Sequence, residues 1–336
     1  MRVTIRPLSR TFAVAAGETV LGAALRAHLN LPHSCKRGSC ASCRARLISG
    51  EISYPAGPPA ALASGAVDPG EVLLCQAVPK SDLVVEARDV RRISDVTTQS
   101  LPCRVTALER LAPDVMRVLL RLPAVARFRY LAGQYLDVML ADGRRRSFSI
   151  ATPPHDAKRL ELHVRRVAGG DFSAFVFDAM APGTLLSIEG PLGQFAYREH
   201  AGPAILVAGG TGFAPIKAIL RHVLEQGSRR PLILYWGARR TVDLYEAAWI
   251  RAMAARYRTL TFVPVLSETA SADSGGLRTG WVHEAVLADH PSPAGFEVYA
   301  AGPPAMIEAI RSSFPRHGLP PEALHFDSFD YAAEVK

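Results

Sequence analysis

The sequence predicts a protein of three domains with three different folds: an α+β domain, a small antiparallel β-barrel and an α/β domain with a parallel sheet. Changes in hydrophobic periodicity predict this division. The first part alternates short period-2 segments with one stretch of helical spacing. The middle part holds strand patterns separated by turn signals about every ten residues, which is typical of a small barrel. In the last part, continuous apolar strands alternate with amphipathic helices, as in a parallel sheet covered on both faces.

The first domain is expected at residues 1–92, with strands in RVTIRPL, TFAVAA and DLVVEAR and a helix in GETVLGAALRAHL. Residues 93–101 are polar and precede Pro102, so we interpret them as a linker. The barrel is expected at residues 102–200, and the α/β domain at residues 201–336. Two or more domains are also what a chain of 336 residues suggests.

The composition is that of a globular protein, with 49% hydrophobic and 21% charged residues. No apolar run reaches the roughly 18 residues of a membrane span, and the first segment has no apolar core of a signal peptide. Five cysteines, a small and odd number, favour a reducing cytoplasm over a disulfide framework. The net charge of +8 has no nucleic-acid-binding motif beside it. We therefore expect neither a nucleic acid nor a membrane as partner. The charge indicates a docking face for an acidic protein or simply a basic surface.

Three cysteines, Cys35, Cys40 and Cys43, are spaced C-x4-C-x2-C, and Cys75 follows farther along the chain. This is the ligand spacing of a plant-type [2Fe-2S] cluster. A structural zinc site would use two close pairs of ligands. A thioredoxin-like pair would need Cys40 and Cys43 to open a helix. We favour the iron–sulfur interpretation, and we expect Cys103 to be a small buried side chain.

Arg146, Phe148 and Ser149 form the pattern R-x-F-S on a predicted strand. A cation for a phosphate, a flat ring for stacking and a hydroxyl for a ring nitrogen suit a flavin nucleotide. The alternative is a basic strand edge closed by a core phenylalanine. In the following HVRRVAGGDFSAFVF, a turn at Gly170 precedes Ser173, which is expected to cap a short helix whose N-terminus receives a pyrophosphate.

In the same segment, His163 and Arg165 alternate with Val164 along the predicted strand, so both side chains are expected to point toward the predicted pyrophosphate site. For each of them the alternative is a strand residue that faces solvent.

The segment ILVAGGTGFAPIKAIL reads as strand, glycine turn and helix. Gly210 and Gly212 allow a phosphate to approach the backbone, but Pro215 stands where the usual dinucleotide fingerprint has its third glycine. The turn could also serve packing alone. The later segments YWGARRTVDLYE, PVLSE and YAAGPPAM follow strands, and ligands bind at the carboxyl ends of parallel strands. We therefore expect a nucleotide to bind there.

The family resemblance described next implies a nicotinamide nucleotide, and the preference between NADH and NADPH is left open. Asp243 could accept the ribose hydroxyls of NADH, whereas Arg239 and Arg240 could receive the 2′-phosphate of NADPH. NADH is the first choice. FAD is preferred over FMN, because GGDFS offers a pyrophosphate site.

These motifs together resemble the reductase components of bacterial oxygenase systems over essentially the whole chain. Those proteins carry a plant-type ferredoxin domain, a flavin barrel like that of ferredoxin–NADP reductase, and a nicotinamide domain. The chain is also similar to the CDP-6-deoxy-glucoseen reductases. The resemblance implies a β-grasp fold for the first domain and a six-stranded antiparallel barrel for the second. It also implies that Cys35, Cys40, Cys43 and Cys75 ligate the cluster.

The resemblance assigns further roles to matching residues. Arg146 would contact the pyrophosphate, Phe148 would stack, and Ser149 would bond near the flavin N5. Ser149 and Thr211 are the expected catalytic residues. The complete set expected at the two nucleotides is Tyr135, Arg146, Phe148, Ser149, His163, Arg165, Gly170, Ser173, Gly209, Gly210, Thr211, Gly212, Gly237, Arg239, Asp243, Gly302, Pro303 and Met306.

One position departs from the family. The family's last strand usually ends in C-G-P, with the thiol beside the nicotinamide, and here Ala301 stands in place of the cysteine. This puts in doubt how well the nicotinamide is held over the flavin. The ending HFDSFDYAAE resembles the family's aromatic C-terminal segment, and whether Phe329 touches the flavin is left open.

The predicted function follows from the number of electrons that each cofactor transfers in one step. A nicotinamide delivers two electrons as hydride, a flavin releases them singly, and a [2Fe-2S] cluster accepts one at a time. The leading hypothesis is an NADH-dependent reductase for a separate oxygenase or its ferredoxin. The alternative is a deoxysugar reductase that feeds a pyridoxamine-phosphate dehydrase. A cluster protein that senses redox state without catalysis is a third possibility. We expect a monomer.

Four cations stand in or just after the thiol loop: Lys36, Arg37, Arg44 and Arg46. They are candidates for the rim that meets an acidic partner. Ordinary solvated charge is the alternative.

Overall fold

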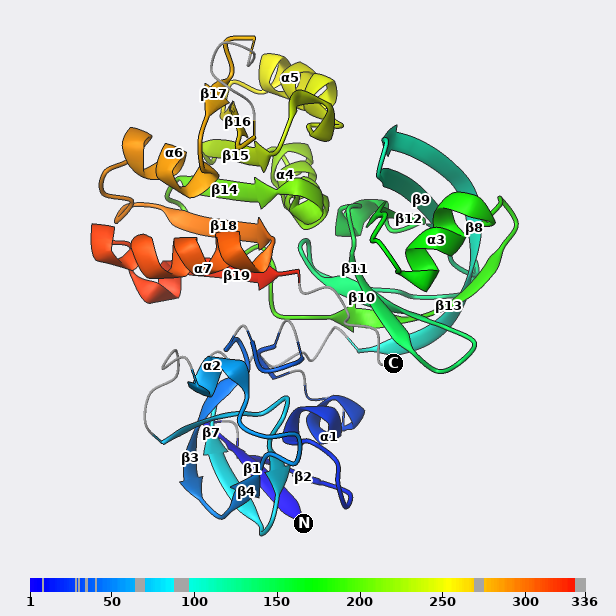
Figure 1. Cartoon of the computed structure of the whole chain (residues 1–336), viewed down its shortest axis with the longest axis vertical. Helices are drawn as coiled ribbons and strands as arrows, with labels where there is room; N and C mark the ends of the chain where they lie inside the picture. Colours follow the sequence, from blue (N-terminus) through cyan, green and yellow to red (C-terminus); the bar gives the residue numbers. More distant parts are fainter. Residues whose placement is uncertain are drawn as a thin grey trace. The chain divides into compact units, whose positions relative to one another are not determined.

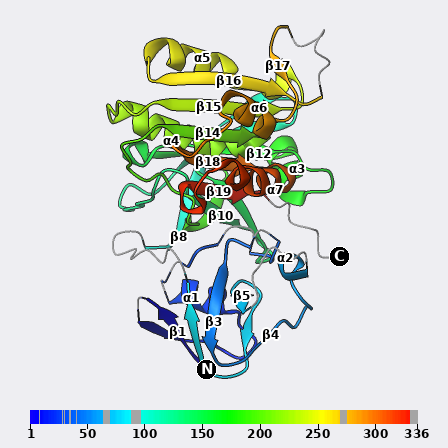
Figure 2. The same ribbon diagram turned by 90° about the vertical axis from the view of Figure 1, so that its left-hand side faces the viewer.

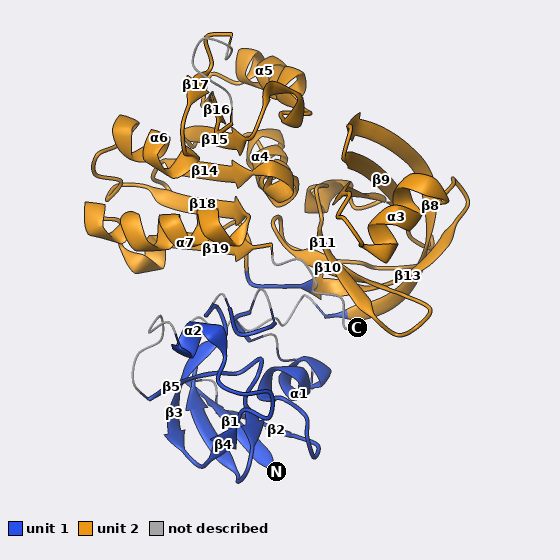
Figure 3. Cartoon of the chain, in the orientation of Figure 1, with its two compact units in different colours: residues 1–98, 192–194 blue, residues 99–191, 195–336 orange. Residues whose placement is uncertain are grey.

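The computed structural model describes the chain except for residues 8, 28, 30, 34–35, 40, 64–69, 88–96, 269–274 and 330–336. The described residues divide into two compact units (Figure 3). Unit 1 contains residues 1–98 and 192–194, and unit 2 contains residues 99–191 and 195–336. Among the described residues, none of the helices combines the length and the apolar character needed to cross a lipid bilayer.

Unit 1 is built on a five-stranded mixed sheet with the order β2-β1-β7-β3-β5. Strand β1 pairs antiparallel with β2 and parallel with β7. Thr19 caps helix α1, since its hydroxyl accepts a hydrogen bond from the Gly22 amide at 3.1 Å. The elements are β1 (Arg2–Arg6), β2 (Arg10–Ala13), α1 (Val20–Arg26), β3 (Arg44–Ser49), β4 (Ile52–Ser53), α2 (Ala60–Ala63), β5 (Glu71–Leu73), β6 (Val78–Pro79) and β7 (Leu83–Glu86).

The core of unit 1 explains why this sequence folds in this way. Val3 and Ile5 alternate along β1 and are fully buried, as the period-2 pattern predicted. Val20 and Leu21 of α1 belong to the same buried cluster. The α+β fold expected for the first domain is therefore confirmed.

The first part of unit 2 is a six-stranded antiparallel sheet with the order β11-β10-β13-β8-β9-β12. A bridge between Ile150 and Leu162 connects the ends of this order, so the sheet closes into the predicted barrel. The elements are β8 (Gln99–Ala112), β9 (Val115–Arg121), β10 (Tyr135–Met139), β11 (Arg145–Ser149), η1 (Pro154–Asp156), β12 (Arg159–Arg165), α3 (Asp171–Asp178) and β13 (Leu185–Leu192). The predicted six-stranded barrel is confirmed.

The second part of unit 2 is a parallel sheet with the order β17-β16-β15-β14-β18-β19, and Figure 2 shows its last five strands in this sequence. The elements are β14 (Ala204–Gly209), η2 (Gly210–Gly212), α4 (Phe213–Glu225), β15 (Leu232–Ala238), η3 (Thr241–Asp243), α5 (Ala247–Arg256), β16 (Leu260–Leu266), β17 (Arg278–Thr279), α6 (Val282–Asp289), β18 (Glu297–Gly302), α7 (Pro304–Ser313), η5 (Pro315–His317), η6 (Pro321–Ala323) and β19 (Leu324–Ser328).

Helices cover both faces of this sheet (Figure 1). Leu206 and Ala208 of β14 pack in one core with α4 and α5, while Ile205 and Val207 pack in another with α6 and α7. The strand order reverses at β14, whose neighbours are β15 and β18. Ligands of such sheets bind at this switch point, beyond the carboxyl ends of the strands.

Candidate functional site

Two of the four predicted cluster ligands, Cys43 and Cys75, are described by the structure and are both buried. Cys43 precedes β3 and Cys75 follows β5, and these strands pair antiparallel with Arg44 opposite Leu73. The amide of Leu74 donates a hydrogen bond to the Cys43 carbonyl at 3.1 Å. Strand pairing thus places the two cysteines at the same end of β3 and β5. The other two predicted ligands, Cys35 and Cys40, lie outside the described residues.

The thiol loop has an unusual backbone. Lys36 and Ala41 have φ angles of 58° and 56°, although neither is a glycine. At Gly38, a Cβ would lie 2.6 Å from the Pro59 Cβ, so only glycine fits there. The side-chain amide of Gln76 donates to the Lys36 carbonyl at 2.9 Å, which ties the loop to the segment that carries Cys75.

Ser42 tests whether this loop fits a cluster. Its hydroxyl is buried and has no hydrogen-bond partner within the described part of the chain. Such a donor is costly unless it is satisfied, and sulfide and thiolate sulfurs can accept its hydrogen bond. The loop therefore fits a cluster next to Cys43. Cys103 is also buried, in unit 2, and burial raises the pKa of its thiol to about 11. The expectation that Cys103 is a small buried side chain is confirmed.

The R-x-F-S residues lie on β11, which pairs with β10 so that Ser149 is opposite Tyr135. Both of these side chains are mostly buried. The ring of Phe148 packs on Phe172 of α3, with 5.4 Å between ring centroids. Arg146 lies on the same face of the strand as Phe148. The register thus places Tyr135 and Ser149 on one face of the β10–β11 pair, while Arg146 and Phe148 lie on the other face. The predicted flavin contacts of these four residues stay predictions.

The helix after the second motif differs from the prediction. Gly170, not Ser173, is the N-cap of α3. Ser173 lies within the first turn, where its hydroxyl donates to the Gly170 carbonyl at 2.9 Å and accepts from the Val167 amide at 3.1 Å. The predicted capping role of Ser173 is therefore wrong, because the helix begins before that residue. No side chain caps the first amides of α3, all of which are described, so they can receive a pyrophosphate.

The glycine turn after β14 is closed against the end of β18. A Cβ at Gly212 would lie 2.0 Å from the Ala301 carbonyl oxygen, and one at Gly209 would lie 2.7 Å from Pro303 and Met306 side-chain atoms. Thr211 lies within the same turn, η2. Parallel pairing of β14 with β18 thus brings together residues about 90 positions apart, at the place where the sequence predicted a nicotinamide nucleotide.

Ala301, which stands where the family has a cysteine, lies in a packed core. Ala301 is fully buried in the core that contains Phe213 and Trp236, whose stacked rings are 4.1 Å apart. Phe329 lies next to this strand end, since its amide donates to the Gly302 carbonyl at 2.9 Å. The possible contact of Phe329 with a flavin stays a prediction.

The segment after β15 holds the predicted ribose site. Gly237 is close-packed, because a Cβ there would lie 2.9 Å from the Val282 Cβ. Asp243 is buried and accepts a hydrogen bond from the Arg240 amide at 3.1 Å, which caps η3. Its carboxylate is also 3.7 Å from Arg239 Nε. Asp243 therefore positions the arginine segment, while its predicted contact with a ribose stays a prediction.

His163 occupies a different environment from the one expected. Its side chain is fully buried, with Nδ1 3.0 Å from the Tyr245 hydroxyl and Nε2 2.7 Å from Glu161 Oε1. The ring also stacks on Phe213, the first residue of α4. Both ring nitrogens are thus used by protein partners, and the side chain joins the barrel to the glycine-turn helix. The predicted nucleotide contact of His163 stays a prediction.

A buried charge cluster surrounds His163, and the sequence reasoning missed it. The Lys217 ammonium donates to Glu161 Oε1 at 2.8 Å and to Glu246 Oε1 at 2.7 Å. Burial opposes the ionisation of Glu161, but the hydrogen bond from His163 and the charges of His163 and Lys217 hold its pKa well below its ordinary value. The sequence did contain a signal of this buried cluster, because Lys217 interrupts an otherwise apolar helix face.

The same cluster has the donor atoms of a metal site, but it does not need a metal. Glu161, His163 and Glu246 offer ligand atoms within 4.8 Å of one another. Lys217 and Arg117 already place cations on both carboxylates. The cluster is therefore an ion-pair network between the barrel and the parallel-sheet domain.

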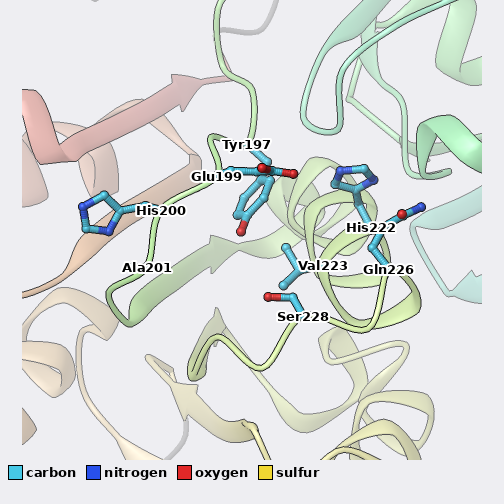
Figure 4. Close-up of a pocket in the computed structure, with 8 residues that line it drawn as sticks. All are labelled: Tyr197, Glu199, His200, Ala201, His222, Val223, Gln226 and Ser228. Atoms are coloured by element: carbon cyan, nitrogen blue, oxygen red, sulfur yellow. The ribbon is translucent and has the colours of Figure 1, made fainter.

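Two cavities lie beside α4, away from the glycine turn. One of about 550 Å³ is lined by Tyr197, Glu199, His200, Ala201, His222, Val223, Gln226 and Ser228 (Figure 4). It adjoins the C-terminal half of α4, whereas the glycine turn precedes the N-terminus. The other, of about 780 Å³, adjoins the charge cluster at Glu161, Lys217 and Trp249. Neither is lined by the residues predicted to hold a nucleotide.

Comparison with known families assigns all three parts of the chain. Residues 3–80 match the 2Fe-2S iron-sulfur cluster binding domain. Residues 102–197 match the oxidoreductase FAD-binding domain, and residues 206–312 match the oxidoreductase NAD-binding domain. The fold and these sites define an NAD(P)H-dependent oxidoreductase that uses FAD and a [2Fe-2S] cluster.

Similar proteins cover the chain from end to end. It is 37% identical to CDP-6-deoxy-L-threo-D-glycero-4-hexulose-3-dehydrase reductase of Yersinia pestis over 98% of both chains. It is 34% identical to terephthalate 1,2-dioxygenase reductase component 1 of Comamonas sp., over 95% of this chain and 94% of the relative. The crystal structure of the Amycolatopsis cytochrome P450 reductase GcoB superposes with a TM-score of 0.81, at 33% identity and over 98% of both chains. The chain belongs to this family of flavin and iron–sulfur reductases, which confirms the predicted resemblance, fold class and cofactors.

Proposed function

We propose that this protein takes two electrons from NADH and delivers them one at a time, through its [2Fe-2S] cluster, to a separate protein acceptor. One observation supports this most strongly. Arg165 of the barrel strand β12 places its guanidinium 3.4–3.5 Å from the position of a Cβ at Gly210. The predicted flavin barrel and the predicted nicotinamide turn therefore adjoin within unit 2, as direct hydride transfer requires.

Residues from different elements would hold the three cofactors. Cys35, Cys40, Cys43 and Cys75 would hold the cluster, which supplies one-electron chemistry when bound. Arg146 would bind the flavin pyrophosphate together with the open N-terminus of α3, and Phe148 would stack. Ser149 and Thr211, the proposed catalytic residues, would orient the two reacting rings from β11 and from η2.

The sequence reasoning also missed Trp281, which we add to the nucleotide site. It is 60% exposed, unusual for a tryptophan, and precedes Val282, whose side chain packs against Gly237 at the end of β15. An exposed indole at this edge of the sheet offers a stacking surface for an adenine.

The acceptor is proposed from the relatives. The leading candidate is an oxygenase component or its ferredoxin, since several relatives are named as oxygenase reductase components. The second candidate is a deoxysugar dehydrase, supported by the 37% identity to the Yersinia reductase. We further propose a monomer that works in the cytoplasm and meets an acidic face of its partner.

An anaerobic titration with NADH, followed by visible and electron paramagnetic resonance spectra, tests the proposal. Flavin bleaching together with a rhombic reduced-cluster signal is expected. A protein that binds both groups but stays oxidised in excess NADH would contradict it. Reduction of each purified candidate acceptor then separates the oxygenase from the dehydrase.

A further inference from the structure

An aspartate of the barrel reaches two arginines that were predicted to bind the nicotinamide nucleotide. Asp114 lies in the turn between β8 and β9. Its Oδ2 is 3.6 Å from Arg165 Nε and also 3.6 Å from Arg239 Nη2. One carboxylate thus connects a barrel strand to the segment that follows β15. Neither the spacing of the motifs nor the family resemblance indicated this connection.

Two guanidinium nitrogens of Arg165 have no hydrogen-bond partner among the described residues. Its guanidinium lies over Gly210 of the turn that begins α4. The two nitrogens, Nε and Nη2, are buried. Glycine turns at helix N-termini admit phosphates, so the diphosphate bridge of a dinucleotide would find this guanidinium beside it.

Arg239 is placed differently, beside the expected ribose. It follows β15, the neighbour of the glycine-turn strand β14, and in such sheets the end of this strand faces the adenosine ribose. Its charge is shared by two carboxylates, Asp114 at 3.6 Å and Asp243 at 3.7 Å. The side chain of Arg239 is 47% exposed.

We propose that Asp114 is a specificity-determining residue that favours NADH over NADPH. The inference rests on the proposed function and deepens it by naming the nucleotide. A 2′-phosphate carries close to two negative charges near neutral pH. To pair with Arg239 it must approach Asp114 and Asp243, and both carboxylates repel it. The uncharged ribose of NADH does not meet this repulsion. Arg239 therefore does not act as a ready-made 2′-phosphate site.

Asp114→Asn tests this in the flavin- and cluster-loaded protein, with binding measured by calorimetry. The probes are 2′,5′-ADP, which carries the 2′-phosphate, and 5′-AMP, which does not. We expect the affinity for 2′,5′-ADP to rise roughly threefold to tenfold, as removal of one nearby charge predicts, and that for 5′-AMP to change less than about twofold. The ratio of kcat/KM for NADPH to that for NADH should rise in parallel.

Asp178→Asn is the matched control. It also removes one barrel carboxylate that pairs with an arginine, Arg166, and it lies at the end of α3. It should leave both affinities and the ratio unchanged. In Asp114→Asn combined with Arg239→Gln, the gain in 2′,5′-ADP affinity should disappear, because the gain acts through Arg239.

Two results would overturn the proposal. One is an unchanged preference in a folded Asp114→Asn protein. The other is an equal gain for both probes, which would mean that Asp114 acts on the 5′-phosphate through Arg165. Failure of the proposed function looks different, because wild-type flavin would then not be reduced by NADH while the calorimetric comparison could still be made.

Discussion

The ammonium of Lys217 lies 2.8 Å from Glu161 Oε1, and this contact joins the helix after the glycine turn to barrel strand β12. Both side chains are largely buried, and the second carboxylate, Glu246, lies 2.7 Å from the same ammonium. Two carboxylates facing each other at this depth need a cation between them. The contact between the barrel and the parallel-sheet domain within unit 2 therefore depends on matched charge.

Lys217→Met should destabilise the protein strongly. Methionine keeps the length of the side chain but removes one of the cations between two buried carboxylates and leaves Arg117 to pair with both, which costs on the order of 3 kcal/mol of the free energy of unfolding. Urea denaturation of the loaded protein measures this. Lys158→Met, at an exposed position of the barrel, is the control. Similar losses in the two variants would show that the buried cluster carries little of the stability.

Glu161→Gln should change the dependence of stability on pH. The pKa of Glu161 lies below its ordinary value of 4.5 in the folded protein, so its ionised form stabilises the fold above about pH 4.5. This contribution is lost as the pH falls through the folded pKa. The melting temperature of the variant should therefore differ most from that of the wild type at neutral pH, and the difference should shrink below about pH 4.5.

Glu284→Gln, at an exposed position of α6, provides the comparison for this pH series. It should show a small difference that does not depend on pH in this range. A Glu161→Gln difference that stays constant from pH 7 to pH 4 would mean that the fold does not lower the pKa of Glu161.

Cys75→Ser and Cys103→Ser should separate cluster ligation from core packing. Loss of one thiolate should remove most of the iron and the visible cluster absorbance in Cys75→Ser. Cys103→Ser should keep both, because its thiol, with a pKa near 11, is protonated at neutral pH. Iron and sulfide analysis together with visible spectra measures this. Iron loss in the Cys103 variant alone would refute the ligand assignment.

Charge reversal at Lys36 and Arg37 should slow electron delivery to the true acceptor without slowing flavin reduction by NADH. Both residues belong to the thiol loop, and charges at the rim of an interface act mainly on association. The effect on the acceptor rate should weaken as salt is added. Stopped-flow measurement of the two half-reactions tests this.

Charge reversal at Arg6 and Arg10 is the matched control for this experiment. These residues lie on β1 and β2, at the far side of the sheet order from β5, which precedes Cys75. They should leave both half-reactions unchanged. Equal slowing of both half-reactions in the loop variant would instead mean that Lys36 and Arg37 support the cluster itself.

Much of the candidate site could be predicted because its signals are local. The C-x4-C-x2-C spacing, the R-x-F-S pattern and the strand–glycine–helix segment each depend on residues a few positions apart. Ser173 shows the limit of such reasoning. The motif correctly indicated a helix after Gly170, but the sequence did not show at which residue the helix begins, and boundaries are set by the whole backbone hydrogen-bond pattern.

The sequence by itself thus determined the three fold types, the cofactor classes and the order of the domains, since hydrophobic period and motif spacing are properties of neighbouring residues. Only the tertiary structure decided which distant residues meet. Pairing of β3 with β5 brings Cys43 near Cys75, burial of α4 makes Lys217 a partner of Glu161, and the β8–β9 turn carries Asp114 to Arg239. These contacts depend on strand register and on the charge balance of buried groups, and neither is encoded in any single short segment.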